Sequence, residues 1–307
     1  MYKAFFGLRE NPFNVNPDPR FLFHTRTIDE TMACLTYGIQ KSRGFLLLTG
    51  EVGTGKTTLI NQLLEWLRKG RVPTAFVFNP RMNPTEFLDF MMTDFGIPME
   101  STMKSRVLWR LNQWLLERYR AHETAVLIVD EAQNLTMELL EEIRLLTNLE
   151  TSSEKLLQII LSGQPELEYK LSQPQLRQLR QRITLRCKTA PLTLEETRGY
   201  IGERLRVAGG NGRAVFKPAA LDAIHRYSQG IPRLINLLCE HALINAYAEG
   251  LKPLPEEIVE GVGGEFQLDA RGPEAVNRSG HGDLYLDGAE PLQTLADLLD
   301  RLRGPRR

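Results

Sequence analysis

The stretch Gly50-Glu51-Val52-Gly53-Thr54-Gly55-Lys56-Thr57 decides the fold of this 307-residue chain. An apolar run at 45–48 precedes it and is typical of a buried strand. After it, Leu59, Leu63, Leu64 and Leu67 repeat at the spacing of an amphipathic helix. The pattern Gly-x-x-x-x-Gly-Lys-Thr between a strand and a helix is the P-loop, so the sequence predicts a phosphate-binding loop here.

Each residue type in this loop has a physical reason to be there. Glycines let successive backbone N–H groups point at phosphate oxygens, and the N-terminus of the following helix favours negative charge. We expect Lys56 to reach the β- and γ-phosphates and Thr57 to ligate Mg²⁺. The alternative is a chance glycine loop, against which the flanking strand and helix argue. The expected nucleotide-binding residues are Gly50, Glu51, Val52, Gly53, Thr54, Gly55, Lys56, Thr57 and Thr58.

A second apolar run, at 125–129, ends in the acidic pair Asp130-Glu131. Open α/β sheets bind ligands at the carboxyl ends of their strands. We therefore expect Asp130 to hold the metal ion and Glu131 to polarise the attacking water, as a nucleotide hydrolase requires. An acidic helix N-cap is the alternative for an isolated pair, and the P-loop favours the catalytic interpretation.

A polar turn, Ser162-Gly163-Gln164-Pro165, follows a further apolar run at 156–161. Gln164 is the candidate to contact the γ-phosphate or the water, and Ser162 is the neighbouring alternative. Polar turns after buried strands are common, so a purely structural turn stays open.

Arg177, Arg180, Arg182 and Arg186 form a basic cluster. A solvated face, a nucleic-acid patch and an arginine finger that acts on the nucleotide of a neighbouring subunit all fit such a cluster. The position just before the last expected strand favours the finger. Arg233 follows Gly230-Ile231-Pro232 at the start of a helix, where it would fold back onto the nucleotide, or else have a surface role.

The order of elements predicts an α/β fold with a second, helical domain. Expected strands at 45–48, 74–78, 125–129, 156–161 and 183–186 alternate with helices, which indicates a parallel sheet covered on both faces. After residue 192 only helices are expected, at 193–207, 218–227 and 232–247, and Thr193 with Glu196 forms a capping box. The predicted fold is a P-loop NTPase sheet domain at 28–192 followed by an all-helical lid at 193–265.

The two ends of the chain differ in composition from the rest. Residues 1–27 are rich in aromatic residues and proline, which is typical of a loop with apolar anchors. Residues 266–291 are rich in Gly, Asp, Arg and Pro and are interpreted as a linker. At 292–304 leucines return at helical spacing, which predicts an amphipathic helix that docks on an envelope-assembly partner or a neighbouring subunit. Packing on its own domain is the alternative.

The overall composition argues against several classes of protein. The 38 basic and 38 acidic residues cancel, so no global charge attracts nucleic acid or anionic lipid. Three distant cysteines encode neither a disulfide framework nor a zinc site. Apolar runs fall short of the roughly 18 residues that a membrane-spanning helix needs. We expect a cytoplasmic protein without a transmembrane segment, or one held at the inner membrane by a partner.

Several stretches resemble the general secretion pathway protein A family of AAA+ ATPases. The resemblance runs from the N-terminus to about residue 265. The matching segments are Phe6-Gly7-Leu8, Asn11-Pro12-Phe13, the loop from Thr49 to Thr57, Asp130-Glu131-Ala132-Gln133-Asn134-Leu135, the segments at 143–150 and 157–167, the arginine-rich segment at 176–183, and Gly230-Ile231-Pro232-Arg233-Leu234-Ile235-Asn236.

This resemblance implies an AAA+ core with a lid, ATP and Mg²⁺ as cofactors, and assembly into a homo-oligomeric ring. It also implies a role in building secretin, pilus or polysaccharide export machinery of a Gram-negative envelope. It puts residues 1–27 near the adenine and assigns Arg182 as the finger and Arg233 as the lid sensor. Direct peptidoglycan binding is not expected, because the tail after 265 departs from the family.

Two other functions remain as alternatives at this point. A DNA-linked regulator of the transposition-ATPase type has a similar core, although zero net charge and the lack of a helix-turn-helix argue against it. A small-molecule kinase would use the same P-loop, but Glu131 beside Asp130 and the absence of an evident acceptor motif oppose it.

Overall fold

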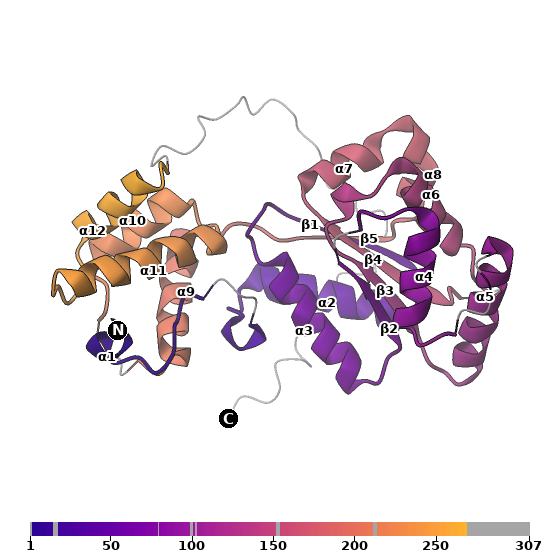
Figure 1. Ribbon diagram of the computed structural model, residues 1–307, viewed down its shortest axis with the longest axis horizontal. Helices are drawn as coiled ribbons and strands as arrows, with labels where there is room; N and C mark the ends of the chain where they lie inside the picture. The colour runs from indigo at the N-terminus through magenta and orange to yellow at the C-terminus, as the bar shows by residue number, and fades with distance from the viewer. Residues whose placement is uncertain are drawn as a thin grey trace. The chain divides into compact units, whose positions relative to one another are not determined.

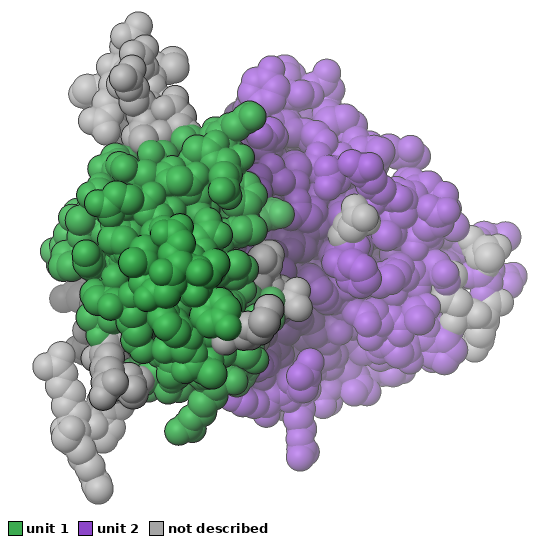
Figure 2. All heavy atoms as spheres, turned by 60° about the vertical axis from the view of Figure 1, so that its left-hand side comes forward, with its two compact units in different colours: residues 1–25, 53–55, 190–294 green, residues 26–52, 56–189, 295–307 purple. Residues whose placement is uncertain are grey.

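The computed structural model describes residues 2–14, 18–78, 80–98, 101, 103–151, 154–210 and 214–268. These residues form two compact units, coloured separately in Figure 2. Among the described residues, unit 1 consists of 2–14, 18–25, 53–55, 190–210 and 214–268, and unit 2 of the remainder of 26–189. Each unit has its own hydrophobic core.

Unit 2 is built on a five-stranded parallel sheet in the order β2-β3-β4-β1-β5. The strands are β1 (Phe45–Thr49), β2 (Thr74–Val77), β3 (Ala125–Val129), β4 (Leu157–Gly163) and β5 (Leu185–Lys188). Parallel neighbours need crossover connections, and helices supply them here (Figure 1). The predicted α/β class is confirmed. The fifth strand, however, begins at Leu185 and not at residue 183 as expected.

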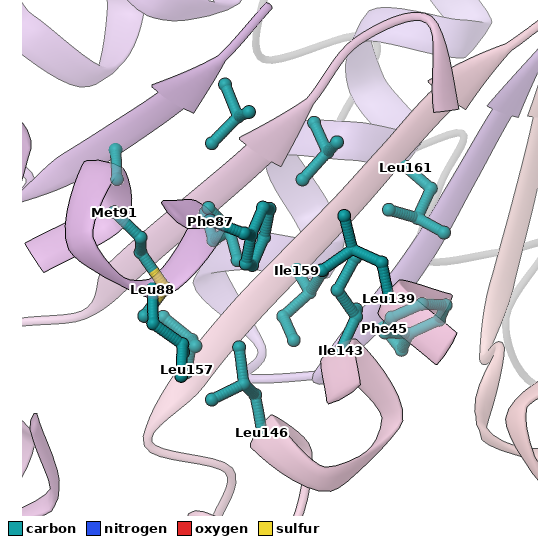
Figure 3. Packing of buried hydrophobic residues seen from close by; sticks show 14 of the residues in the cluster. Phe45, Phe87, Leu88, Met91, Leu139, Ile143, Leu146, Leu157, Ile159 and Leu161 are labelled. Atoms are coloured by element: carbon teal, nitrogen blue, oxygen red, sulfur yellow. The ribbon is translucent and has the colours of Figure 1, made fainter. Parts of the chain in front are cut away.

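The two faces of the sheet pack on different helices. On one face Phe45, Leu47 and Ile159 belong to a cluster with α4 (Pro84–Asp94), α5 (Lys104–Arg120) and α6 (Met137–Leu146), part of which Figure 3 shows. The central strands β1, β3 and β4 are buried along their whole length. The sequences of these strands are therefore largely continuous apolar runs, as expected for strands covered on both faces.

The opposite face is covered by α2 (Arg26–Gln40) and α3 (Lys56–Lys69) (Figure 1). Gly38 of α2 lies so close to the sheet that a Cβ there would meet Leu46 Cδ2 at 2.3 Å and Leu185 Cδ1 at 2.9 Å. A glycine costs a helix some stability. This close packing explains the glycine in α2, because a side chain there would force Leu46 and Leu185 to shift.

Four short helices between β3 and β5 were not predicted. They are η2 (Ala132–Asn134), α7 (Pro165–Ser172), η3 (Pro174–Leu176) and α8 (Arg177–Arg182). They are too short to show a hydrophobic period, and α8 is mostly Arg and Gln. Their positions matter because η2 and α7 directly follow the candidate catalytic residues at the ends of β3 and β4.

Unit 1 is helical and contains α9 (Leu194–Val207), α10 (Pro218–Ser228), α11 (Pro232–Ala248) and α12 (Glu256–Glu265). Thr193 and Glu196 form the predicted capping box at the start of α9. The sequence reasoning missed α12, whose three glycines lower its helix propensity. At Gly263 a Cβ would lie 2.8 Å from the Tyr227 ring, so close packing against α10 explains that glycine.

The N-terminal segment belongs to the core of unit 1. It was expected to be a loop, but Tyr2–Phe6 form the helix α1 and Pro19–Phe21 a 3-10 turn. Phe6, Leu8 and Phe13 are buried among residues of the lid helices. The loop expectation was therefore wrong at these two places, while the expected apolar anchors are present.

Arg204 of α9 holds the N-terminal segment in place through hydrogen bonds. The residue is 6% exposed, and its guanidinium donates to the carbonyls of Pro12 and Asn14 and to the hydroxyl of Tyr200. It also stacks on the ring of Phe21, 4.6 Å from the centroid. A buried cation is tolerated when its donors are paired, as they are here.

The predicted linker at 266–291, apart from its first three residues, and the predicted helix at 292–304 lie outside the described residues. Scanned over the part that the structure describes, the chain has no helix whose length and hydropathy would suffice to cross a bilayer.

We expect Arg204→Met to destabilise unit 1 by about 3 kcal/mol, because it leaves buried acceptors without a donor. The measurement is urea unfolding together with limited proteolysis of the N-terminal segment. Arg206→Met is the matched control, since Arg206 is exposed and, among the described residues, forms an ion pair only with Glu203. The control should cost less than about 1 kcal/mol. Equal losses in both variants would contradict a fastening role for Arg204.

Candidate nucleotide-binding site

The strand ends bring the predicted catalytic residues together. Register pairs Val129 of β3 with Leu161 of β4, and Thr49 of β1 with Gly163 of β4. The residues that follow β1 and β3 therefore lie at the same edge of the sheet as the end of β4. Parallel pairing in this register explains why Gly50, Asp130 and Gln164, far apart in the sequence, meet in one site.

The loop between β1 and α3 has the backbone that a P-loop needs. Gly53 and Gly55 have φ angles of +81° and +97°, in a region that other residues rarely adopt. A Cβ on Gly55 would have no atom within 4 Å, so backbone conformation and not crowding demands that glycine. Helix α3 begins directly after it, at Lys56. The helix N-terminus therefore faces the loop, as phosphate binding requires.

Lys56 is buried at the base of this loop. Only 6% exposed, it donates from Nζ to the carbonyls of Gly50 at 2.7 Å and Glu51 at 2.9 Å. Burial lowers the pKa of Lys56, and the nearby carboxylates of Glu131 and Asp130 act in the opposite direction. The ammonium group is thus held beside both acidic residues, where phosphate charge would also favour it.

Asp130 is a buried carboxyl with three donors. Its oxygens accept from Ser162 Oγ at 2.7 Å, from the backbone N–H of Glu131 at 2.9 Å and from Thr57 Oγ1 at 3.3 Å. Burial raises its pKa, and these hydrogen bonds offset part of the rise. The neighbouring carboxylate and hydroxyl are oxygen ligands of the kind that Mg²⁺ prefers, so the predicted pair Thr57 and Asp130 fits a magnesium site.

Glu131 is held by two amide side chains. Its backbone is left-handed, with φ of 53° and ψ of 36°, which is uncommon for a non-glycine residue and occurs often at functional sites. Its carboxylate accepts from the Nε2 groups of Gln133 and Gln164, the latter at 3.3 Å. The structure thus brings Gln164 to Glu131, whereas Ser162 is bonded to Asp130.

Sequence reasoning missed Gln133 as a functional residue. Its amide also accepts from the backbone N–H of Gln164 at 3.1 Å, so it connects the ends of β3 and β4. Lys170 of α7 supports the same turn by donating to the carbonyls of Gln133 and Leu135. The signal that would have indicated Gln133 is its position two residues after Glu131, inside a segment shared with the resembled family.

Glu168 is a second residue that the sequence did not single out. Its carboxylate accepts from Thr49 Oγ1 at 2.5 Å and pairs with Lys188 Nζ at 3.1 Å. Burial acts to raise its pKa, but the Thr49 and Lys188 contacts outweigh it and the pKa is lowered. Glu168 therefore joins α7 to the last residue of β1, immediately before the P-loop.

The arginine cluster is split between different environments. Arg182 donates to Thr147 Oγ1 and to the Arg144 carbonyl, at the C-terminal end of α6. The side chain of Arg180 is exposed and forms no hydrogen bond or ion pair with any described residue. None of the described contacts brings either arginine to Asp130 or Glu131.

Arg233 lies in unit 1, at the start of α11. Its side chain is exposed, and its backbone N–H donates to the carbonyl of Gly53, a residue of the same unit, at 3.2 Å. A Cβ on Gly53 would lie 2.7 Å from Arg233 Cβ, so Gly53 is required here for space as well as for its positive φ.

These features define an AAA+ P-loop protein, a fold that implies nucleotide binding. Residues 39–171 match the model of an AAA domain. Within this class the chain is a relative of "General secretion pathway protein A" of Aeromonas hydrophila, with 46% identity over 251 residues. The match covers 81% of this chain and 46% of the relative, so the chain spans less than half the length of that protein. The predicted resemblance is thereby confirmed.

Solved structures support the fold alone. The Aeropyrum pernix ORC2 protein has a TM-score of 0.62 at 20% identity, covering 83% of this chain and 71% of that one. The Thermotoga maritima RuvB branch migration motor has a TM-score of 0.55 at 14% identity, with 82% and 72% covered. Both similarities confirm a P-loop sheet followed by a helical region.

We expect the stability cost of Ser162→Ala to depend on pH. Burial raises the pKa of Asp130, and the Ser162 hydrogen bond acts to lower it because the bond favours the ionised carboxyl. The contribution of this bond to the free energy of unfolding is therefore present where Asp130 is ionised and declines as pH falls through the pKa of Asp130. Urea unfolding of the nucleotide-free protein should show a loss of about 2 kcal/mol near pH 8 and a smaller one near pH 4. In Ser172→Ala, which removes an exposed hydroxyl, no pH-dependent difference is expected. A Ser162→Ala loss that is the same at both pH values would show that the bond does not favour the ionised carboxyl.

Proposed function

We propose that this chain hydrolyses ATP with Mg²⁺ and uses the cycle to assemble a secretion, pilus or polysaccharide export system of the cell envelope. One observation carries the hydrolysis. At the end of β3, Asp130 faces Thr57, while two amides orient the adjacent Glu131. A metal-binding carboxylate beside an oriented base is what phosphoryl transfer to water needs, whereas a kinase has no use for a base directed at water.

The roles of the residues follow from their surroundings. Lys56 and the N-terminus of α3 would bind the phosphates, and Thr57 with Asp130 would hold the metal ion. Bound Mg²⁺ would supply charge neutralisation. Glu131 would accept the proton of the attacking water, and Gln133 and Gln164 would keep its carboxylate in place. In this proposal residues 1–27 lie on the adenine side, and Arg233 responds to the nucleotide from the lid.

The similarity to "General secretion pathway protein A" supports the envelope role. Because ATP is available in the cytoplasm, we propose that the chain acts there, or at the inner membrane through a partner. The leucine-bearing segment at 292–304 is our candidate for docking on that partner. No described feature favours the DNA-linked alternative over this function.

Lys56→Ala and Glu131→Gln should separate binding from hydrolysis. We expect Lys56→Ala to weaken ATP binding by about two orders of magnitude, because a charge-assisted phosphate contact is lost. Glu131→Gln should retain binding and lower turnover by about 10²–10⁴-fold. The measurements are calorimetric ATP binding and phosphate release without any added acceptor. Lys69→Ala, at the exposed end of α3, is the control and should change neither.

The same variants test the envelope role in cells. Glu131→Gln produced beside the native protein should block export dominantly, since it binds ATP without turnover, while Lys69→Ala should not. Similar loss of ATP affinity in Lys56→Ala and Glu131→Gln would refute the assigned roles. Normal export with the Glu131→Gln protein present would refute the envelope role while leaving the ATPase assignment intact.

We further propose that the protein acts as a ring in which an arginine of α8 contacts the nucleotide of the neighbouring subunit. The family resemblance assigns Arg182, and exposed Arg180 is the alternative. As a finger, Arg182 would leave Thr147 and the end of α6, whereas Arg180 has no such contact to break among the residues that the structure describes.

Arg182→Ala should lower turnover by about 10³-fold or more with ATP affinity of the isolated subunit nearly unchanged. Mixing it with Lys56→Ala subunits should restore part of the activity, because one variant supplies an intact P-loop and the other an intact arginine. Arg180→Ala is assayed in parallel. If only Arg180→Ala shows loss and rescue, the finger is Arg180. If Arg182→Ala loses turnover without rescue, the arginine acts within its own subunit.

A further inference from the structure

Two free cysteines from distant parts of the sequence meet inside unit 2. Cys34 lies in the middle of α2 and Cys187 in β5, 153 residues apart, and their Sγ atoms are 2.7 Å apart. A disulfide needs a separation of about 2.05 Å, so the two sulfurs have less than about 1 Å still to move. Cys187 is 5% exposed, whereas Cys34 is partly open to solvent.

The packing of α2 on β5 imposes this approach. One turn before Cys34, Thr31 Oγ1 donates to the Lys188 carbonyl at 3.1 Å. One turn after it, Gly38 lies against Leu185 so closely that a Cβ would come within 2.9 Å. The helix is thus fixed to the strand on both sides of the cysteine pair.

We propose that Cys34 and Cys187 are an oxidation site that forms an intramolecular disulfide with a low-molecular-weight disulfide as oxidant. Cys34 thiolate attacks the oxidant, forms a mixed disulfide and releases one thiol. The Cys187 thiol then loses its proton and attacks Cys34 Sγ, which releases the second thiol. In sum, two protein thiols are oxidised to one disulfide and the oxidant is reduced to two thiols.

The order of attack follows from the environment of each sulfur. The Cys187 S–H donates to Cys34 Sγ, and this hydrogen bond lowers the pKa of Cys34 although burial acts to raise it. The pKa of Cys187 is raised by the same pairing and by its burial. The more exposed sulfur is therefore also the better nucleophile, as a thiol that reacts first should be.

The disulfide would stabilise unit 2 against unfolding. Leu48 of β1 pairs with Cys187 of β5, so the linked strand lies beside the strand that leads into the P-loop. A covalent link between α2 and β5 closes a long loop of chain, which restricts the unfolded state. Oxidation should therefore make the sheet domain harder to unfold.

The test uses the folded, reduced full chain and oxidised glutathione as the probe. We expect thiol titration in denaturant to fall from three thiols to one, the mass to fall by about 2 Da, and a non-reducing peptide map to join Cys34 to Cys187. The melting temperature should rise by about 5 °C and return on reduction. Cys239, fully buried in unit 1, is the matched control. Cys239→Ser should oxidise in the same way, from two thiols to none.

Variants of the pair distinguish the steps. Cys34→Ser should abolish oxidation and the gain in melting temperature. Cys187→Ala should stop at a stable glutathione adduct on Cys34, and if that variant does not fold, the peptide map of the native chain still decides. Retention of three thiols in the native chain, a lasting glutathione adduct on it, or a link that includes Cys239 would overturn the proposal.

Discussion

The in-register parallel pairing of β4 with its neighbours β1 and β3 is the constraint on which the site depends. It sets Val129 beside Leu161 and Thr49 beside Gly163. Asp130 and Ser162 are consequently level with each other and hydrogen-bonded. A slip of one residue in β3 would turn Asp130 to the other face and separate it from Thr57. These strands are buried on both faces along their whole length. Packing against a layer of helices on each face therefore fixes their register.

The sequence was most informative where a local pattern and a physical requirement coincide. The P-loop could be predicted because its glycines, lysine and threonine are consecutive and lie between a strand and a helix. The capping box at Thr193 is equally local. In contrast, α12 was missed because its glycines oppose a helix, and only the position of the Tyr227 ring explains one of them.

The arrangement around Glu131 could not be predicted for a related reason. Gln133 contacts Glu131 across a left-handed backbone turn at Glu131, and no residue pattern indicates that turn. Similarly, the meeting of Cys34 with Cys187 depends on how α2 packs on β5, which spacing along the chain does not reveal. Contacts that arise from packing between elements need the structure, whereas contacts within one element can often be predicted from sequence.

The composition of unit 1 has a consequence for synthesis of the protein. Its core combines Phe6 and Phe13 with residues of helices that begin after residue 190. The N-terminal aromatic residues therefore emerge from the ribosome long before their packing partners exist. At a synthesis rate of about 5–20 residues per second they wait for roughly ten seconds or more, exposed while the sheet unit is made. During that interval the nascent chain presents an apolar segment that chaperones can bind, and the lid core cannot be completed until the helices after residue 190 have been made.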